Sequence, residues 1–316
     1  MVKQCTLAFN KGMALLVPVM VVLALSVAGV TVIGKLYVRQ SVLHNRSLAY
    51  QQAALEVSNR LAVAQLSLEA MLLEPGSSFE SISTQFPLTE IASGNDLVLH
   101  LTTLSAASEV APLGVAHRAE QQYLLSPFLH AVPASALTAH AAFPLHPALN
   151  VRLYNDEGAP IFSQSLDAPL YHHFGMNADE LVNAARYMGR LVTQCSELNE
   201  FSHGLYLLTQ HCEFHRHVQI GSPASPVLLI INNSDFTLSG ASALYGLVVT
   251  VNSSEITDTH MRISTDSSVI GGIISSHRMS ARSHIVARLD QNIMRALQRA
   301  PALQRVTPVT GSWHDF

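Results

Sequence analysis

A group of histidines in the middle of the chain has the residue types and spacing of a metal site. The segment reads His211-Cys212-Glu213-Phe214-His215-Arg216-His217. If it forms a strand, the side chains of His211, Glu213, His215 and His217 share one face, because successive residues alternate. Arg216 lies among them, and no second cluster with metal-ligand spacing occurs. Polar surface histidines are therefore the favoured interpretation, metal binding is the alternative, and we predict neither metal nor cofactor.

The sequence contains no recognisable set of catalytic residues. It has no Gly-x-Ser-x-Gly elbow, phosphate loop, His-Glu-x-x-His helix or dinucleotide fingerprint. The acidic pair Asp179-Glu180 is typical of a helix start, where carboxylates interact favourably with the helix dipole. We therefore predict that the protein is not an enzyme.

Two cysteines could form a disulfide in the large C-terminal part of the chain. Cys195 and Cys212 are the only cysteines apart from Cys5. A bridge closing the interval between them would contribute on the order of 3 kcal/mol to the free energy of unfolding in the loop-entropy model. A bridge favours an oxidising compartment. The alternative is two unpaired buried thiols.

The composition is unusually poor in charge. Only 13% of the 316 residues are Asp, Glu, Lys or Arg, and 48% are hydrophobic, whereas soluble domains carry about 25% charged residues. These values exclude an intrinsically disordered chain. The net charge of −4 argues against nucleic-acid binding. Every charged side chain before Glu56 is Lys or Arg, which indicates a basic membrane-proximal end and a mildly acidic exported body.

One segment is long enough to cross a bilayer. Residues 13–34 contain no charge over 22 positions, about 33 Å of helix against a hydrocarbon core of about 30 Å. The run is too long for a cleaved secretory signal, and no small-x-small site follows it. We predict a transmembrane helix with the body of the protein beyond it. The short segment before it, residues 1–12, leaves no output domain for a single-span sensor.

The helix is predicted to continue as an amphipathic stalk over residues 35–74. Neither glycine nor proline occurs between Gly34 and Pro75. Apolar residues recur every seventh position, with a second set in the complementary position: Leu36, Leu43, Tyr50, Val57, Ala64 and Met71, with Ala54, Leu61 and Leu68. Such a stripe must be covered. Its second half is expected to pack on the protein's own body, or alternatively its first half packs against other subunits.

The body is predicted to mix helices with short strands. Residues 77–170 indicate irregular β structure, with Tyr123–Pro127 in a turn-containing connection. A helix is expected near residues 177–198, capped by Asn177 and Glu180 and including Leu191 and Val192 on its apolar face. Further on, β-branched runs predict strands at Val227–Ile231, Leu247–Val251 and Ile270–Ile274.

An internal repeat distinguishes the last third of the chain. Phe236–Ser239 aligns with Met261–Ser264, and at the same offset Gly246 aligns with Gly271. A repeat of this length is typical of coils stacked as a solenoid, here a short β-helix-like layer covered by a helix at Ile285–Ala300. The alternative is an antiparallel sheet with similar hairpins.

The N-terminus resembles a type IV prepilin, and most closely the PilX-type minor pilins. Their helices typically begin with Gly-x-Ala-Leu-Leu-Val and continue with an Asn-x-x-Leu-Ala-Tyr stretch. The corresponding segments here are Gly12–Val17 and Asn45–Ala54. The resemblance implies cleavage after Gly12 and N-methylation of Met13 by prepilin peptidase. Major pilins carry a Glu at the fifth mature position, where this chain has Val17; PilX-type pilins and K-type pseudopilins usually lack that Glu too.

The body resembles large PilX-type assembly proteins more loosely. The resemblance rests on a Phe-Gly helix start, a cysteine before a Gly-Ser-Pro turn, a Tyr-Gly strand and a terminal Gly-Ser-Trp motif. Their counterparts are Phe174-Gly175, Cys212 with Gly221-Ser222-Pro223, Tyr245-Gly246 and Gly311–Phe316. The order of these motifs carries the resemblance, which is weakest over residues 77–170.

Together these features predict an α+β protein in which a long N-terminal transmembrane and amphipathic helix carries a β-rich ectodomain. The expected parts are a leader (1–12), a transmembrane segment (13–34), a stalk (35–74), a mixed α/β region (75–220) and a β-repeat region with a C-terminal helix (221–316). The implied function is a minor pilin of the inner membrane with a periplasmic ectodomain. Its partners would be prepilin peptidase, other pilins, inner-membrane assembly proteins and lipid. The alternatives are a K-type pseudopilin of type II secretion and an anchored periplasmic binding protein.

Overall fold

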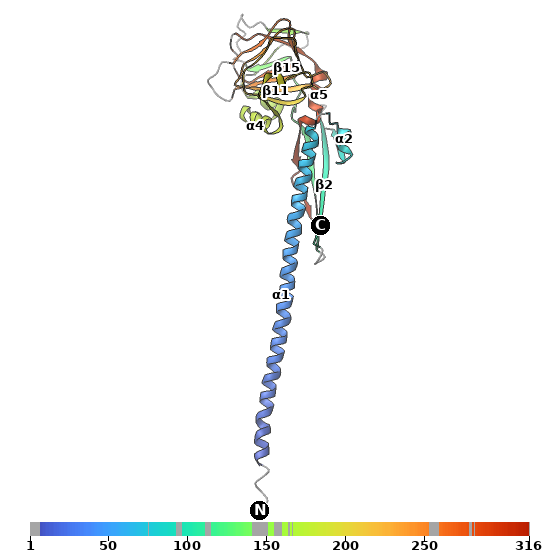
Figure 1. Ribbon diagram of the computed structural model, residues 1–316, viewed down its shortest axis with the longest axis vertical. Coiled ribbons are helices and arrows are strands. Elements are labelled where there is room, and N and C mark those ends of the chain that lie inside the picture. The colour runs from blue at the N-terminus through green and yellow to red at the C-terminus, as the bar shows by residue number, and fades with distance from the viewer. Residues whose placement is uncertain are drawn as a thin grey trace, which may run out of the picture. The chain divides into compact units, whose positions relative to one another are not determined.

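The structure is a computed structural model of an α+β protein, with a long apolar N-terminal helix and a sheet-rich region (Figure 1). It describes residues 7–74, 76–92, 97–110, 115–140, 151–154, 160–163, 165, 167–252, 259–277, 280 and 282–315. The chain divides into two compact units. The first comprises Met1–Ala62, Ser105–Glu120 and His314–Phe316, and the second comprises Val63–Leu104 and Gln121–Trp313.

The first element is a single helix of 67 residues, α1 (Leu7–Leu73). At 1.5 Å per residue it is about 100 Å long. The helix begins before Met13, where the sequence predicted its start, so Gly12 and Met13 lie within it. The first half of the predicted leader lies outside the described residues. The end at Leu73 agrees with the predicted stalk of residues 35–74, because no helix breaker precedes Pro75.

The other helices are short. They are α2 (Phe79–Ser83), α3 (Ala168–Phe174), α4 (Ala178–Met188) and α5 (Gln291–Arg299), with 3-10 turns at Cys195–Glu197 and Pro301–Leu303. The predicted capping box at the start of α4 is confirmed: Asn177 Oδ1 accepts from Glu180 N at 2.9 Å, and Glu180 Oε2 accepts from Asn177 N at 3.0 Å.

Three predicted helical features are wrong. α4 ends at Met188, because Gly189 turns extended there, and Leu191 and Val192 belong to strand β7 (Arg190–Val192). Phe174-Gly175 is a helix end, since Gly175 adopts a left-handed conformation after α3. The expected helix at Ile285–Ala300 begins only at Gln291, because Ile285–Leu289 pairs as a buried strand and Asp290 caps the helix that follows.

A five-stranded sheet includes two long strands, β2 and β3, of 13 residues each. Its order is β1-β2-β3-β17, with β18 also pairing with β3. The strands are β1 (Leu88–Ala92), β2 (Val98–Val110), β3 (Val115–Pro127), β17 (Gln304–Pro308) and β18 (His314–Asp315). Tyr123–Pro127, predicted as a turn-containing connection, is the end of β3. β structure was expected in this region, but these long strands were not.

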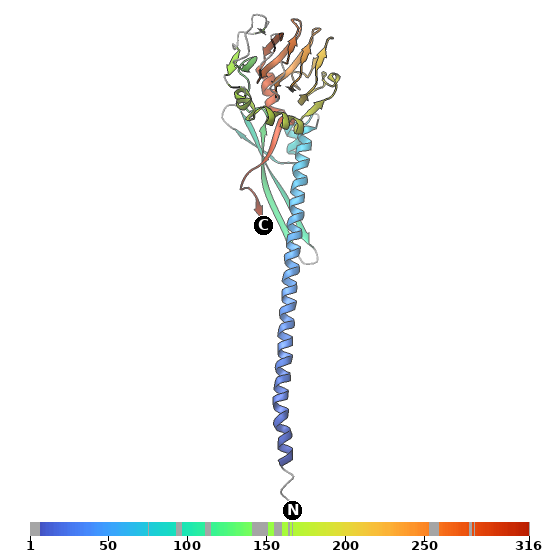
Figure 2. The same ribbon diagram turned by 90° about the vertical axis from the view of Figure 1, so that its left-hand side faces the viewer.

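The second sheet has ten strands, and every strand pairing among its described residues is parallel (Figure 2). Its main order is β5-β16-β15-β13-β11-β8-β7, with β4, β6 and β10 beside it. The bounds are β4 (Leu137–His140), β5 (Val151–Tyr154), β6 (Ile161–Ser163), β8 (Gly204–Leu208), β10 (Gln219–Ile220), β11 (Val227–Asn232), β13 (Ala243–Val251), β15 (Ser268–Ser275) and β16 (Ile285–Leu289).

A third, three-stranded sheet is also parallel, in the order β14-β12-β9. Its strands are β9 (Cys212–Phe214), β12 (Phe236–Leu238) and β14 (Met261–Ile263). The two segments of the sequence repeat pair with each other in register: Phe236 lies opposite Met261, and Gly246 lies opposite Gly271. The three predicted strands are present as β11, β13 and β15, and the antiparallel alternative is wrong.

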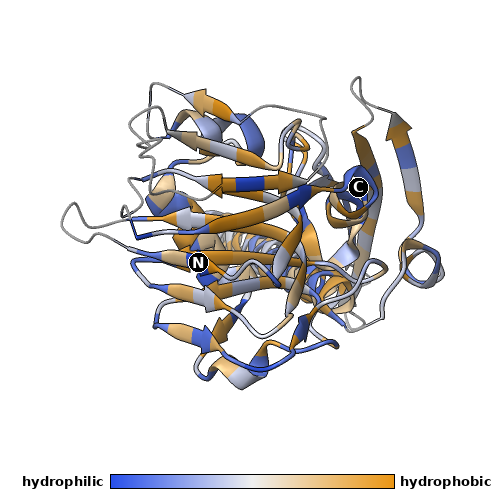
Figure 3. Cartoon of the chain, turned by 90° about the horizontal axis from the view of Figure 1, so that it is seen from above, coloured by the Kyte–Doolittle hydropathy of each residue, from blue (hydrophilic) through white to orange (hydrophobic). Residues whose placement is uncertain are grey.

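The hydrophobic core of the second unit lies along these parallel strands. All six residues of β11 are buried, as are the last six of β13. Figure 3 shows hydrophobic residues along the stacked strands. Parallel strands are covered on both faces, so their sequences become continuous apolar runs. This explains why the sequence located β11, β13 and β15 so closely.

Candidate functional site: the exposed face of the N-terminal helix

Residues 16–48 of α1 are not packed against any other described part of the chain. Every side chain from residue 16 to residue 48 is exposed. Leu36 is 59% exposed and Leu43 is 58% exposed, so two of the predicted packing residues are not buried by the described part of the chain. Among the described residues, α1 is the one helix that is long and apolar enough to cross a membrane. By length and composition, it is a candidate membrane anchor.

From Ala49 onward one face of the helix is buried. Within the first unit the buried side chains follow a four-residue spacing: Ala49, Ala53, Val57 and Leu61. Residues four apart lie on one face of a helix. Polar contacts flank this face, because Arg60 Nη1 donates to Ala107 O and Glu56 Oε2 accepts from Ser108 Oγ. The segment Ser105–Glu120, which includes parts of β2 and β3, therefore lies against this part of α1.

Two further contacts hold the same face. The ring of Tyr50 meets the ring of His117 edge-on, with centroids 5.1 Å apart, although 48% of Tyr50 stays exposed. The hydrogen bonds that Glu56 accepts from Ser108 and Arg60 hold the pKa of its carboxyl below the ordinary value. Arg60 and Glu56 are one helical turn apart and form an exposed ion pair. The contacts that join α1 to the strands are therefore the Tyr50–His117 ring pair and the hydrogen bonds of Arg60 and Glu56 to Ala107 and Ser108.

The last turns of α1 pack inside the second unit. Leu68 and Leu72 are fully buried and form a cluster with Ile82 and Leu125. The predicted packing residues thus divide along the helix. Val57, Leu61 and Leu68 are buried, whereas Leu36, Leu43 and Tyr50 are exposed. This arrangement agrees with the prediction that the second half of the apolar stripe packs on the protein's own chain.

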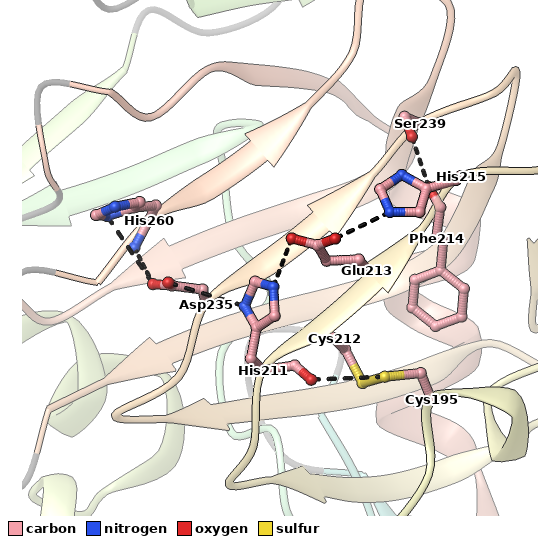
Figure 4. A network of polar contacts seen from close by, with 9 residues as sticks. All are labelled: Cys195, His211, Cys212, Glu213, Phe214, His215, Asp235, Ser239 and His260. Carbon is pink, nitrogen blue, oxygen red and sulfur yellow. Dashed lines mark hydrogen bonds and ion pairs between the residues drawn. A yellow bond between two sulfur atoms is a disulfide. The ribbon is translucent and has the colours of Figure 1, made fainter.

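The histidine segment forms an exposed polar network (Figure 4). Glu213 bridges two imidazoles: His211 Nε2 lies 2.6 Å from Oε1, and His215 Nε2 lies 2.9 Å from Oε2. These hydrogen bonds lower the pKa of the Glu213 carboxyl. His217 does not join the network, because β9 ends at Phe214 and His217 Nδ1 lies 2.6 Å from Ala241 O.

Among the described residues, no group of three His, Cys, Asp or Glu side chains is arranged to hold a metal ion. Asp235 lies between two of the histidines, with oxygens 3.8 Å from His211 Nδ1 and 3.9 Å from His260 Nδ1. His211, Asp235 and His260 each precede one strand of the three-stranded sheet. The network therefore connects the starts of three adjacent strands, through exposed side chains at His211 and Glu213 and partly buried ones at Asp235 and His260.

Cys195 and Cys212 form a disulfide, with an S–S distance of 2.07 Å and a Cα–Cα distance of 5.5 Å. Cys195 lies in the 3-10 turn before β8, and Cys212 is fully buried at the start of β9. The bridge therefore joins the turn to the first strand of the three-stranded sheet. Cys212 is turned inward, and so it does not contribute to the exposed histidine network (Figure 4).

Sequence reasoning missed the strand segments that cover α1. In β2 the side chains of Thr102, Leu104, Ala106 and Ser108 are buried in strict alternation. Two of these four are hydroxyl residues and one is alanine, so the alternation carries little hydropathy contrast. Alternation of apolar and polar residues is the sequence signal for such a strand, and the small and hydroxyl side chains at the buried positions of β2 weaken it.

No protein-family model, no curated protein and no solved structure matches this chain.

Proposed function

We propose that the protein is a non-enzymatic minor pilin, anchored in the inner membrane by α1 and built into a type IV pilus through the same helix. The observation that carries the proposal is the division of α1 at Ala49. A helix exposed from residue 16 to residue 48 and apolar over much of that length continues directly into one whose apolar face is buried. Contiguous exposed apolar surface of this size marks a membrane or protein contact.

The two environments of a pilin account for this helix. Before assembly, lipid covers residues 13–34; after assembly, the helices of neighbouring subunits cover them. Removing the apolar side chains from water stabilises either state at about 25 cal/mol per Å² buried. The resemblance of Gly12–Val17 to a prepilin cleavage site supports processing after Gly12 and methylation of Met13. Prepilin peptidase, other pilins and inner-membrane assembly proteins are the partners that this proposal implies.

The parallel sheets support a β-helix-like ectodomain. In several strand pairs the partners are separated by 23 to 25 positions: Gly204 with Val227, Cys212 with Phe236, and Gly246 with Gly271. The interval between β11 and β13 is shorter, because Val227 pairs with Gly246 at a separation of 19. We infer that each such interval is one coil of a short solenoid, with α5 lying against β13 and β15. In this proposal the solenoid is displayed on the periplasmic side and then at the pilus surface, and the disulfide suits that oxidising compartment.

The second candidate is a K-type pseudopilin of type II secretion. A largely helical second domain would favour it. The parallel strand repeats favour the minor pilin instead. An anchored periplasmic binding protein is the third alternative, and it would not need the prepilin-like segment around Gly12.

The proposal is tested by following the protein into sheared surface filaments. Wild-type protein is expected in the filament fraction, and Gly12→Asp should leave it in the membrane fraction because the peptidase needs an unobstructed backbone at that glycine. Gly29→Ala is the matched control, since an added methyl there meets nothing within 4 Å. If wild-type protein is absent from filaments yet is required for secretion, the K-type alternative replaces the proposal.

A further inference from the structure

A second exposed apolar surface lies within the second unit, between the end of α1 and strand β17. It is an open groove of about 510 Å³, lined by α1 between Leu66 and Leu73, by Tyr187 and Met188 at the end of α4, and by Gln304–Thr307. Tyr187 is 80% exposed and Leu66 is 59% exposed. The volume lies in the range of ligand-binding sites.

The β17 wall of the groove is the free edge of the five-stranded sheet. β17 is the last strand in the order β1-β2-β3-β17, and its described partner is β3 alone. Four consecutive residues of β17 line the groove. Successive side chains point to opposite faces of a sheet, so a groove that meets all four lies at the strand's edge.

Some main-chain N–H and C=O groups of β17 are not hydrogen-bonded to β3. Phe128 N donates to Leu303 O and Val309 N donates to Gln122 O, so residues 303, 305, 307 and 309 are the ones bonded to β3. The main chain of Gln304 and Val306 therefore points away from β3. The N–H of Gln304 bonds to Pro301 O. The N–H and C=O of Val306 have no partner among the described residues.

Arg305, one of the residues that line the groove, has no counter-ion among the described residues. Arg305 lies over the ring of Phe128, 5.6 Å from its centroid, and its guanidinium contacts Nε2 of His130. Its Nε is buried without an acceptor. Burial lowers the pKa of Arg305, and burial together with the nearby Arg305 lowers the pKa of His130. Among the described residues, no carboxylate lies within ion-pair distance of Arg305.

The opposite wall does not supply the missing anion. Glu69 lines the groove from α1, where its Oε1 accepts a hydrogen bond from Gln65 Nε2 at 2.9 Å. The groove thus combines apolar walls, an unpaired strand edge and a partly buried cation without a counter-ion among the described residues. The apolar walls suit apolar side chains of a ligand, the strand edge suits an extended main chain, and the cation suits a carboxylate.

We propose that this groove binds an extended segment of a partner protein, which adds as a strand to β17 and places an Asp or Glu side chain at Arg305. The main chain of the segment would pair with Val306, its apolar side chains would cover Leu66 and Tyr187, and its carboxylate would satisfy the guanidinium. A lipid or a helix would leave Val306 unpaired. This inference does not rest on the pilin assignment.

Photo-crosslinking in living cells tests the proposal with the full-length chain. Benzoylphenylalanine is placed at Tyr187, and in a control strain at Glu90 in β1, the other edge of the same sheet. The expected product at position 187 joins one continuous segment of another protein that contains Asp or Glu, identified by peptide mapping. Position 90 should not yield that segment.

Variants in the Tyr187 background test the two recognition elements. Val306→Pro removes the edge N–H and should lower the yield of the product at least about fivefold. Arg305→Gln should lower it similarly, whereas Arg305→Lys keeps the charge and should retain most of it. Leu66→Asp lies on an exposed helix position, so it tests the groove without disturbing the sheet and should also lower the yield.

Four results would overturn the proposal. These are a product with lipid, a product with a second copy of this chain, no product at all, or a yield that Arg305→Gln and Leu66→Asp leave unchanged.

Discussion

Gly271 in β15 lies directly opposite Gly246 in β13, and neither position has room for a side chain. A Cβ on Gly246 would lie 1.8 Å from Val227 O in β11, and a Cβ on Gly271 would lie 2.0 Å from Gly246 O. Both glycines have positive φ, 150° and 139°. The glycines of the sequence repeat therefore mark the close approach of three successive parallel strands.

Substituting these glycines should destabilise the protein strongly. Gly246→Ala and Gly271→Ala are each expected to cost about 3 kcal/mol or more in the free energy of unfolding, because the methyl group meets backbone atoms and the φ is unfavourable for alanine. Gly272→Ala is the matched control, since its nearest contact, Leu247 Cδ1, lies at an ordinary 3.4 Å. Urea unfolding in detergent measures all three variants, and equal costs at positions 271 and 272 would contradict the close approach.

The two parts of α1 should respond differently to truncation. Leu61 is buried, so Leu61→Ala is expected to lower the free energy of unfolding by about 2–4 kcal/mol. Leu43 is exposed, so Leu43→Ala should change it by less than about 0.5 kcal/mol. Under the proposed function, Leu43→Ala should instead reduce the amount of protein in sheared filaments. A large loss of stability in Leu43→Ala would show that this part of the helix packs on its own chain.

The disulfide should stabilise the second unit measurably. Replacing Cys195 and Cys212 by alanine is expected to cost about 3 kcal/mol, because the bridge closes an interval of 17 residues in the unfolded chain. Reductant should destabilise the wild type by a comparable amount and leave the double variant unchanged. Thermal melts with and without dithiothreitol make the comparison, and a wild type that is insensitive to reduction would contradict it.

His173 should make stability depend on pH. Its side chain is buried, and burial lowers its pKa from 6.5 to about 4, although Nδ1 lies 2.7 Å from Ala131 O. The unfolded chain takes up a proton near pH 6.5, whereas the folded chain does so only near pH 4. Stability is therefore complete above about pH 6.5 and is lost as the pH falls toward 4, by about 2–3 kcal/mol.

The control for this effect is a pair of asparagine variants. His173→Asn is expected to be less stable at neutral pH but to lose less between pH 7 and pH 4.5 than the wild type does. His44→Asn changes an exposed histidine and should keep the wild-type pH profile. Chemical unfolding at the two pH values measures the difference, and parallel profiles for wild type and His173→Asn would contradict the assignment.

The elements that could be predicted from the sequence are those with a clear local pattern: a run without helix breakers, a helix cap or a continuous apolar segment. The stalk contains no helix breaker, α4 begins with a complete capping box, and β11, β13 and β15 are uninterrupted apolar runs. The failures have a common cause. Ile285–Leu289 is a short apolar run directly before a helix, so its hydrophobic pattern fits a strand and a helix equally well. The segment is a strand because it pairs in parallel with β15 and β5.

The candidate site could be only partly predicted for a similar reason. Leu43 and Leu61 belong to the same apolar stripe. Such a stripe predicts that its side chains are buried, but it does not show whether the same chain, another subunit or lipid buries them. The segments that cover this part of α1 lie in β2 and β3, whose inward side chains include Ala106 and Ser108 and therefore lack hydropathy contrast. The groove beside β17 depends on contacts between segments that lie far apart in the sequence, which no local pattern records.

The mass of the mature N-terminus shows whether the protein is processed as a prepilin. The protein is purified from cells with and without prepilin peptidase, and its N-terminal peptide is measured. We predict a chain that begins at Met13 with one added methyl group when the peptidase is present, and an uncleaved Gly12–Met13 bond when it is absent. An intact Met1 in both strains, or cleavage beyond residue 34, would contradict the proposed function.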